Sequence, residues 1–249
     1  QPRGHFIFDW ARYIFRNDDW YFIAVGGKLC CVIFCQTTRY ASHEPDQIMR
    51  PAMHPSVTAV LDATRALWTT IPSLSAFAAW PDDLVAGTAA TSPAPAAAKI
   101  IAWQPDEDTI TTPLYHAIQH AAPHVNWQFI YSEAQVGRHF LDNYGYFELI
   151  GPTGHFHSDK CNAYIAYWGP DLYYPAHHHA SEELYFVLSG AAMFESDGDA
   201  AARLGPTEHR FHASHQPHAM TTTDSAILTL VLWRGPDLCG LSQLTTSAD

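Results

Sequence analysis

Residues 173–190 read YYPAHHHASEELYFVLSG, and their spacing predicts a metal site on two adjacent β-strands. Alternate side chains of a strand share one face of the sheet, so His177 and His179 point the same way. The short residues that follow allow the chain to reverse. On the return strand Glu183 and Tyr185 share a face. The spacing therefore predicts that two imidazoles, a carboxylate and a phenol converge on one point.

The donor types in this stretch favour one divalent transition metal ion. Histidine and carboxylate ligands suit Fe, Mn, Zn, Ni or Co, and no thiolate lies close enough in sequence for a structural zinc site. We expect a fourth ligand from His218, which directly precedes an apolar strand, although His209, His212 and His215 compete for this role. The alternative is that these are ordinary surface residues of a chain with 16 histidines. Gly190 argues against that alternative, because it falls where the next turn should start.

The overall charge excludes some classes of partner. The 249 residues carry 25 acidic and 13 basic side chains, for a formal net charge of −12. Nucleic acids and anionic membranes are bound by clustered Lys and Arg, so neither is an expected partner. A small zwitterionic substrate is compatible with this surface. With 47% hydrophobic residues, the chain has enough apolar surface for a sizeable core.

The cysteines and the N-terminal segment bear on the location of the protein. Five cysteines with no framework spacing indicate buried, reduced thiols, and therefore a cytoplasmic protein. The apolar run 20–35 is interrupted by Gly26, Gly27 and Lys28 and is shorter than the roughly 20 residues of a membrane helix. The acidic pair before it is unlike a signal peptide. We expect no membrane span or secretion, and interpret the run as a strand pair or a poorly packed extension.

Helices are expected between the N-terminal segment and residue 143. Apolar residues at helical spacing predict one helix from Pro55 to Pro72, a second over 112–122 and a short third over 132–143. Residues 86–98, rich in Ala, Thr, Ser and Pro, predict a surface loop or flexible link.

From residue 144 the pattern changes to short strands separated by Gly, Pro and Asp turns at intervals of about 8–12 residues, which indicates an antiparallel sandwich or barrel. We therefore expect residues 1–143 to form an N-terminal extension and helical segment. Residues 144–249 are expected to form a metal-binding β-barrel domain.

The quoted stretch resembles the first motif of the cupin superfamily. That motif is G-x5-H-x-H-x3,4-E-x6-G, and its last part matches His177, His179, Glu183 and Gly190. A second motif supplies one more histidine, which best matches His218, about 40 residues after the second histidine. The resemblance implies a mainly β protein: a cupin barrel (a double-stranded β-helix or jelly roll) preceded by helices.

A closer resemblance is to the bacterial cupin-type dimethylsulfoniopropionate (DMSP) lyases. It rests on the extension H-x-H-x3-E-x-Y, which ends at Tyr185, and on the combination of YWGP with the quoted stretch. The resemblance implies a metal-dependent carbon–sulfur lyase that cleaves DMSP to dimethyl sulfide and acrylate by β-elimination.

The implied reaction needs a base for the proton next to the carboxylate. Tyr185 is the candidate, because a neighbouring cation can stabilise a phenolate whose pKa is otherwise about 10. Tyr173 has the same strand parity as His177, so we expect it to point inward and orient the substrate carboxylate. Trp168, Phe194 and Trp233 offer aromatic faces for a sulfonium cation. His155 and His157 are further candidates for a fifth ligand or an acid–base group, although a loop histidine near a barrel mouth is more often neither.

Two other interpretations use the same donor set. A cupin dioxygenase or sugar isomerase would act on another small carboxylate or a sugar, and the dioxygenase would consume oxygen. A non-catalytic cupin sensor would need a partner domain, against which the charge balance argues. Cupins often pair their barrels, so a homodimer is the assembly that the resemblance suggests.

Overall fold

The computed structural model describes residues 16–17, 20–25, 28–31, 53–104 and 109–245. The chain divides into two compact units, residues 1–48 and 49–249. In the first unit β1 (Arg16–Asn17), β2 (Trp20–Val25) and β3 (Lys28–Cys31) form an antiparallel sheet, which confirms the expected strand pair. No helix among the described residues is both long and apolar enough to cross a membrane.

The second unit begins with the helices α1 (Pro55–Thr70), α2 (Pro72–Phe77), α3 (Pro95–Ala102), α4 (Thr112–Ala121) and α5 (Glu133–Asp142). Of these, α1, α2 and α3 start at a proline and α4 has a proline as its second residue. Proline suits the first turn of a helix because its missing N–H has no partner to lose there. The three expected helices are confirmed as α1, α4 and α5. The expected loop over 86–98 is wrong at its C-terminal end, because α3 starts at Pro95 and buries Ala96 and Ile100 in the core.

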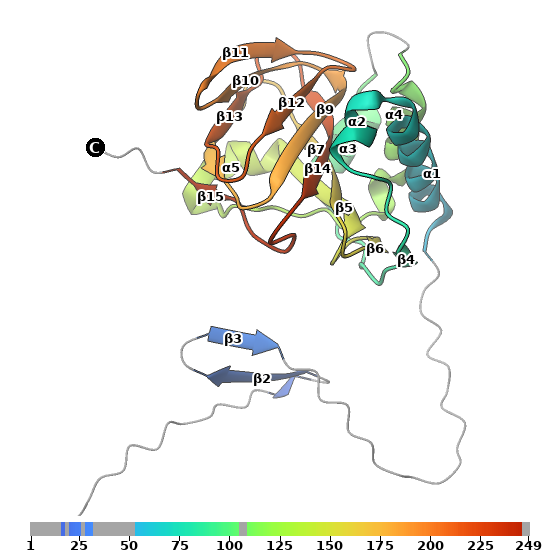
Figure 1. Ribbon diagram of the computed structural model, residues 1–249, viewed down its shortest axis with the longest axis vertical. Helices are drawn as coiled ribbons and strands as arrows, with labels where there is room; N and C mark the ends of the chain where they lie inside the picture. The colour runs from blue at the N-terminus through green and yellow to red at the C-terminus, as the bar shows by residue number, and fades with distance from the viewer. Residues whose placement is uncertain (1–15, 18–19, 26–27, 32–52, 105–108, 246–249) are drawn as a thin grey trace, which may run out of the picture. The chain divides into compact units, whose positions relative to one another are not determined.

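Two sheets follow and enclose the barrel interior (Figure 1). The larger has the order β12-β9-β14-β7-β5-β6-β4. Its strands are β4 (Val85–Ala86), β5 (Tyr144–Gly151), β6 (Phe156–His157), β7 (Asn162–Trp168), β9 (Glu182–Gly190), β12 (His209–His212) and β14 (Ile227–Arg234). The smaller has the order β11-β10-β13-β8-β15. Its strands are β8 (Tyr173–His178), β10 (Ala192–Ser196), β11 (Asp199–Leu204), β13 (His218–Thr221) and β15 (Gln243–Leu244).

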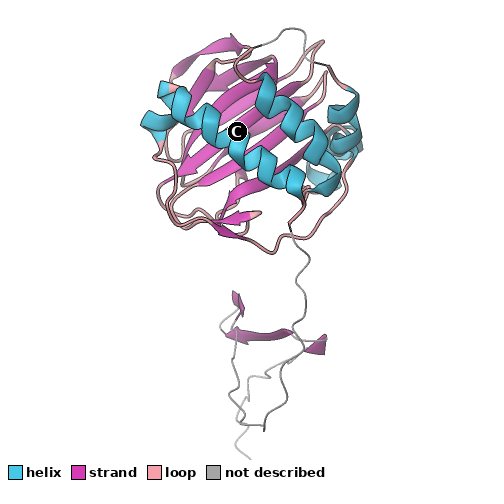
Figure 2. Ribbon diagram, turned by 90° about the vertical axis from the view of Figure 1, so that its right-hand side faces the viewer, coloured by secondary structure: helices cyan, strands magenta, loops and turns pink. Residues whose placement is uncertain are grey.

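The larger sheet is buried on both faces, and each face belongs to a different core cluster. On β9, Leu184 and Phe186 pack with the residues of α1, α3 and α4. Tyr185 and Val187, at the alternate positions, face the barrel interior. Figure 2 shows helices lying across the outer face of the sheet. The helices therefore cover an apolar sheet surface, and the interior is left for the site. The division at residues 143/144 into two domains stays a prediction.

The two cysteines of the second unit are both free thiols. Cys161 is buried, as expected, whereas Cys239 is exposed. Burial raises the pKa of the Cys161 thiol to about 11. The side chains of Cys30, Cys31 and Cys35 lie outside the described residues.

Candidate metal centre

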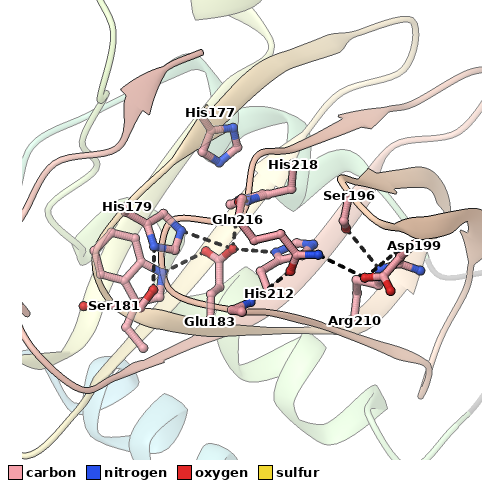
Figure 3. A network of polar contacts seen from close by, with 12 residues as sticks. His177, His179, Ser181, Glu183, Ser196, Asp199, Arg210, His212, Gln216 and His218 are labelled. Atoms are coloured by element: carbon pink, nitrogen blue, oxygen red, sulfur yellow. Dashed lines mark hydrogen bonds and ion pairs between the residues drawn. The ribbon is translucent and has the colours of Figure 1, made fainter.

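Three histidines and a glutamate meet in the barrel interior (Figure 3). They do not come from two adjacent strands, as the spacing predicts, because β8 and β9 belong to different sheets that face each other. His177 lies on β8 and His179 directly follows it. Glu183 lies on β9, and His218 opens β13, where it is the cross-strand partner of His177. All four side chains are at least 96% buried. The four residues that the sequence singles out as metal ligands are therefore brought together.

The three imidazoles share one hydrogen-bonding pattern. In each of His177, His179 and His218, Nδ1 lies 2.8 Å from a backbone carbonyl oxygen two residues away. A carbonyl oxygen only accepts, so Nδ1 carries the hydrogen and Nε2 of the neutral ring keeps its lone pair. This arrangement leaves Nε2 as the ligand atom.

Glu183 is the centre of the cluster. Its Oε2 lies 3.0 Å from Nε2 of His218 and 3.4 Å from Nε2 of His179, and its Oε1 accepts a hydrogen bond from Nε1 of Trp233 at 2.8 Å. Burial alone would raise the pKa of Glu183. Without an ion, the positive charge of protonated His179 and His218 outweighs burial and holds this pKa well below its usual range. Burial likewise opposes protonation of His179, and the carboxylate outweighs it, so the pKa of His179 is raised.

These groups fit a divalent cation. A lone-pair nitrogen that faces a carboxylate oxygen is repelled unless a positive charge lies between them. Nε2 of His179 and Nε2 of His218 are buried and have no hydrogen-bond partner among the described residues. Two overlapping groups have ligand atoms within 4.8 Å of one another: one is His177, His179 and His218, and the other is Glu183, His212 and His218. Imidazole and carboxylate donors of this kind are the donor set that divalent transition metal ions accept.

His212, one of the rivals in the sequence, is also part of the cluster. Its Nδ1 lies 2.9 Å from Oε2 of Glu183, and its ring stacks on that of His218 with centroids 3.9 Å apart. Burial lowers the pKa of His212 to about 4. The other two rivals, His209 and His215, are exposed. The signal that would have found His212 is its register opposite Glu183 in the β12–β9 pair, which only the structure supplies.

An aromatic pocket opens beside the cluster. Its walls include Tyr146, Tyr164, Trp168, Tyr174, Tyr185 and Trp233. Glu183 is the one charged side chain among the described residues of this lining. The ring of Tyr185 lies near two of the histidines, with centroids 5.6 Å from His212 and 6.4 Å from His218.

The expected inward orientation of Tyr173 is wrong, because its side chain is 55% exposed. The neighbouring Tyr174 is 3% exposed and lines the pocket instead. The register between β8 and β13 shifts between His218 and Met220, so the alternation counted from His177 is broken before it reaches Tyr173. Pro175 lies inside this irregular stretch.

Burial and charge set the acidity of the phenols. Burial, and then the charge of Glu183, raise the pKa of Tyr185 well above 10. Burial raises the pKa of Tyr174 in the same way. The protein's own groups therefore favour neutral phenols in this pocket.

The remaining candidates lie elsewhere. His155 is buried on the other side of β5, where its Nε2 accepts a hydrogen bond from the backbone N–H of Asn126. Nδ1 of His157 lies 3.1 Å from a carbonyl oxygen in its own loop. Phe194 packs in the interior against Tyr185 but does not line the pocket. Trp168 and Trp233 do line it, as the sequence suggests.

Comparisons with known proteins match most of this chain to one family of enzymes. The family model described as dimethylsulfoniopropionate lyase matches residues 73–229. DMSP lyase DddQ of Ruegeria pomeroyi is 38% identical over 185 residues, which covers 73% of this chain and 90% of that protein. The crystal structure of the R. pomeroyi enzyme superimposes with a TM-score of 0.73 at 37% identity, covering 77% of this chain and 96% of that one. A structure from a study of the DMSP lyases RdDddP and RnDddQII gives a TM-score of 0.75 at 40% identity, covering 77% and 98%.

Proposed function

Because this chain belongs to the dimethylsulfoniopropionate lyase family, we propose that it cleaves DMSP to dimethyl sulfide and acrylate by metal-assisted β-elimination, with Tyr185 as the general base. The chain is a carbon–sulfur lyase with a cupin barrel. The observation that carries the mechanism is the pair of unpartnered Nε2 atoms facing the Glu183 carboxylate beside an aromatic pocket.

The residues that would hold the ion are His177, His179, Glu183 and His218. Three neutral imidazoles and one carboxylate leave a net positive charge on a divalent site, which suits a substrate that arrives with a carboxylate. A bound divalent ion would polarise a substrate carboxylate oxygen and lower the pKa of a nearby phenol. Which metal the protein uses is set by availability as well as by these donors.

Tyr185 would remove the proton from the carbon next to the carboxylate. It follows Glu183 by two residues on β9 and therefore shares its inward face. As the phenolate takes up the proton, the C–H electron pair forms the new double bond and the C–S pair leaves with neutral dimethyl sulfide. Tyr174, which takes the inward place expected for Tyr173, would donate a hydrogen bond to the substrate carboxylate.

The aromatic walls would receive the sulfonium group. Tyrosine and tryptophan faces attract a soft cation through their π-electrons, and a neutral sulfide leaves such a pocket without breaking an ion pair. Trp233 and Tyr164, whose rings lie edge to face at 5.5 Å, offer one such surface. A homodimer and a cytoplasmic location remain predictions from the sequence.

The test is headspace gas chromatography of dimethyl sulfide after addition of DMSP to protein loaded in turn with Fe, Mn, Ni, Co or Zn. We expect release that a chelator abolishes, that metal restores and that proceeds without oxygen. Oxygen-dependent turnover would indicate a dioxygenase instead. No release with any of the five metals would withdraw DMSP as the substrate.

A further inference from the structure

Glu183 is the middle residue of a row that crosses three strands of the larger sheet. Its two cross-strand partners are Trp233 on β14 and His212 on β12. Directly opposed side chains of antiparallel strands share a face and lie within contact distance. Nε1 of Trp233 donates to Oε1 at 2.8 Å, and Nδ1 of His212 donates to Oε2 at 2.9 Å. The carboxylate is therefore held from both neighbouring strands, by Trp233 on Oε1 and by His212 on Oε2. Figure 3 shows the contact of His212 with Glu183.

His212 is connected differently from His177, His179 and His218. Their Nδ1 atoms donate to backbone carbonyl oxygens, whereas Nδ1 of His212 faces the carboxylate itself. Its Nε2 is buried and has no hydrogen-bond partner among the described residues. The two nitrogens of an imidazole point in divergent directions, so this Nε2 points away from the oxygen that Nδ1 contacts.

The ring of His212 also supports a second member of the cluster. It lies almost parallel to the ring of His218, with centroids 3.9 Å apart and an interplanar angle of 16°. His212 is 0% exposed, so packing fixes its own plane. One side chain thus restrains both a carboxylate and an imidazole of the proposed ligand set.

We propose that His212 is a positioning residue of the metal site, which orients Glu183 and His218 without binding the ion itself. The inference rests on the proposed metal site. With its Nδ1–H on Oε2, His212 occupies one lone-pair direction of that oxygen, and Trp233 occupies Oε1. Each oxygen keeps a second lone-pair direction, and Oε2 is the oxygen that faces Nε2 of His179 and Nε2 of His218. Loss of such an outer hydrogen bond typically weakens metal affinity by about 10- to 100-fold.

Three substitutions separate orientation from ligation. In His212→Asn the amide nitrogen stands as many bonds from the backbone as Nδ1, so the donor to Glu183 is kept. In His212→Gln the donor is one bond further out, and in His212→Ala it is absent. His179→Ala serves as the reference for loss of a ligand. Circular dichroism and thermal melts confirm that each variant is folded, and the Asn variant keeps the inference testable if the Ala variant does not fold.

The readouts are Co²⁺ affinity, by competition with a chromogenic chelator, and the visible absorption spectrum of the Co²⁺-loaded protein. We expect the Asn variant to bind within about threefold of wild type with an unchanged spectrum, and the Gln and Ala variants to bind about 10- to 100-fold more weakly. Wild-type affinity in the Ala variant would overturn the inference. An Asn variant as weak as the Ala variant, with an altered spectrum, would make His212 a ligand and overturn it too. If His179→Ala keeps full affinity, the metal site itself is refuted, which is a separate result.

Discussion

Two adjacent histidines have opposite surroundings and form a matched pair for substitution. His179 is 4% exposed and faces Glu183, whereas His178 points away and its Nδ1 lies 3.3 Å from the hydroxyl of Thr245. We expect His179→Ala to lose both bound metal and activity, because one donor of the set is removed. His178→Ala should keep both. The metal content of both variants, measured by mass spectrometry, tests this expectation. One bound metal ion per chain in His179→Ala would remove His179 from the ligand set.

The pocket tyrosines differ in the role we assign to them. Tyr185→Phe removes the proposed base and should lower kcat by about 10²- to 10⁴-fold while metal content stays at wild type. Tyr174→Phe removes a hydrogen-bond donor to the substrate, so we expect mainly a higher KM. Steady-state kinetics on both variants, with metal content measured in parallel, gives the comparison. Near-wild-type kcat in Tyr185→Phe would place the base elsewhere.

At the residue scale, the spacing of residues predicts which side chains share a face wherever a strand is regular. The positions of His177, His179, Glu183 and Tyr185 follow from alternation along two strands, and the structure brings all four together. The orientation of Tyr173 did not follow, because the β8–β13 register shift breaks the alternation. The contact of His212 with Glu183 could not be predicted either, since it depends on how β12 pairs with β9 across 29 residues of sequence.

At the scale of elements, His155 ties the segment before α5 to the end of β5. Its Nε2 accepts from the backbone N–H of Asn126 at 3.0 Å, and burial lowers its pKa below the ordinary 6.5. The unfolded chain therefore binds a proton more readily than the folded protein. The contribution of His155 to the free energy of unfolding is fully present above pH 6.5 and is lost as the pH falls below this value. For one proton, the free energy of unfolding falls by at most about 1.4 kcal/mol per pH unit.

Replacement of that ring tests the pH effect. His155→Gln keeps an acceptor near the position of Nε2 but does not titrate. We expect wild type to lose more unfolding free energy than His155→Gln when urea denaturation is repeated at pH 7.5 and pH 5.5. Equal losses in the two proteins would show that His155 does not contribute to the pH dependence.

Element boundaries were predictable where the sequence carries explicit signals. Pro55 and Pro72 bracket α1, and Ser132 with Gln135 forms the capping box that starts α5. The sequence does not predict helix α3, because its alanines, next to prolines and threonines, resemble a linker in composition. Its helical conformation depends on the burial of Ala96 and Ile100 against α4 and the sheet.

At the scale of the whole molecule, helices and barrel share one core. Leu184, Phe186, Leu230 and Leu232 on the outer face of the larger sheet are at most 3% exposed and belong to the same cluster as α1 and α4. A fragment of residues 144–249 would expose this apolar face to water. We expect it to aggregate, whereas residues 49–249 should melt cooperatively. A soluble, monomeric barrel fragment with a cooperative melt would contradict this expectation.

Metal binding should also stabilise the whole second unit, because the proposed ligands join β8, β9 and β13 from both sheets. An ion that binds only the folded protein adds about 2.7 kcal/mol at 100 times its Kd. For a unit of this size, 1 kcal/mol corresponds to about 2–4 °C in Tm, so removal of the ion should lower Tm by about 5–10 °C. Calorimetry of metal-loaded and chelator-treated protein measures the shift. The matched control is His179→Ala, whose Tm should not respond to the chelator because the ion is already lost. An equal shift in the variant, or no shift in wild type, would mean that the ion does not link these strands in the folded protein.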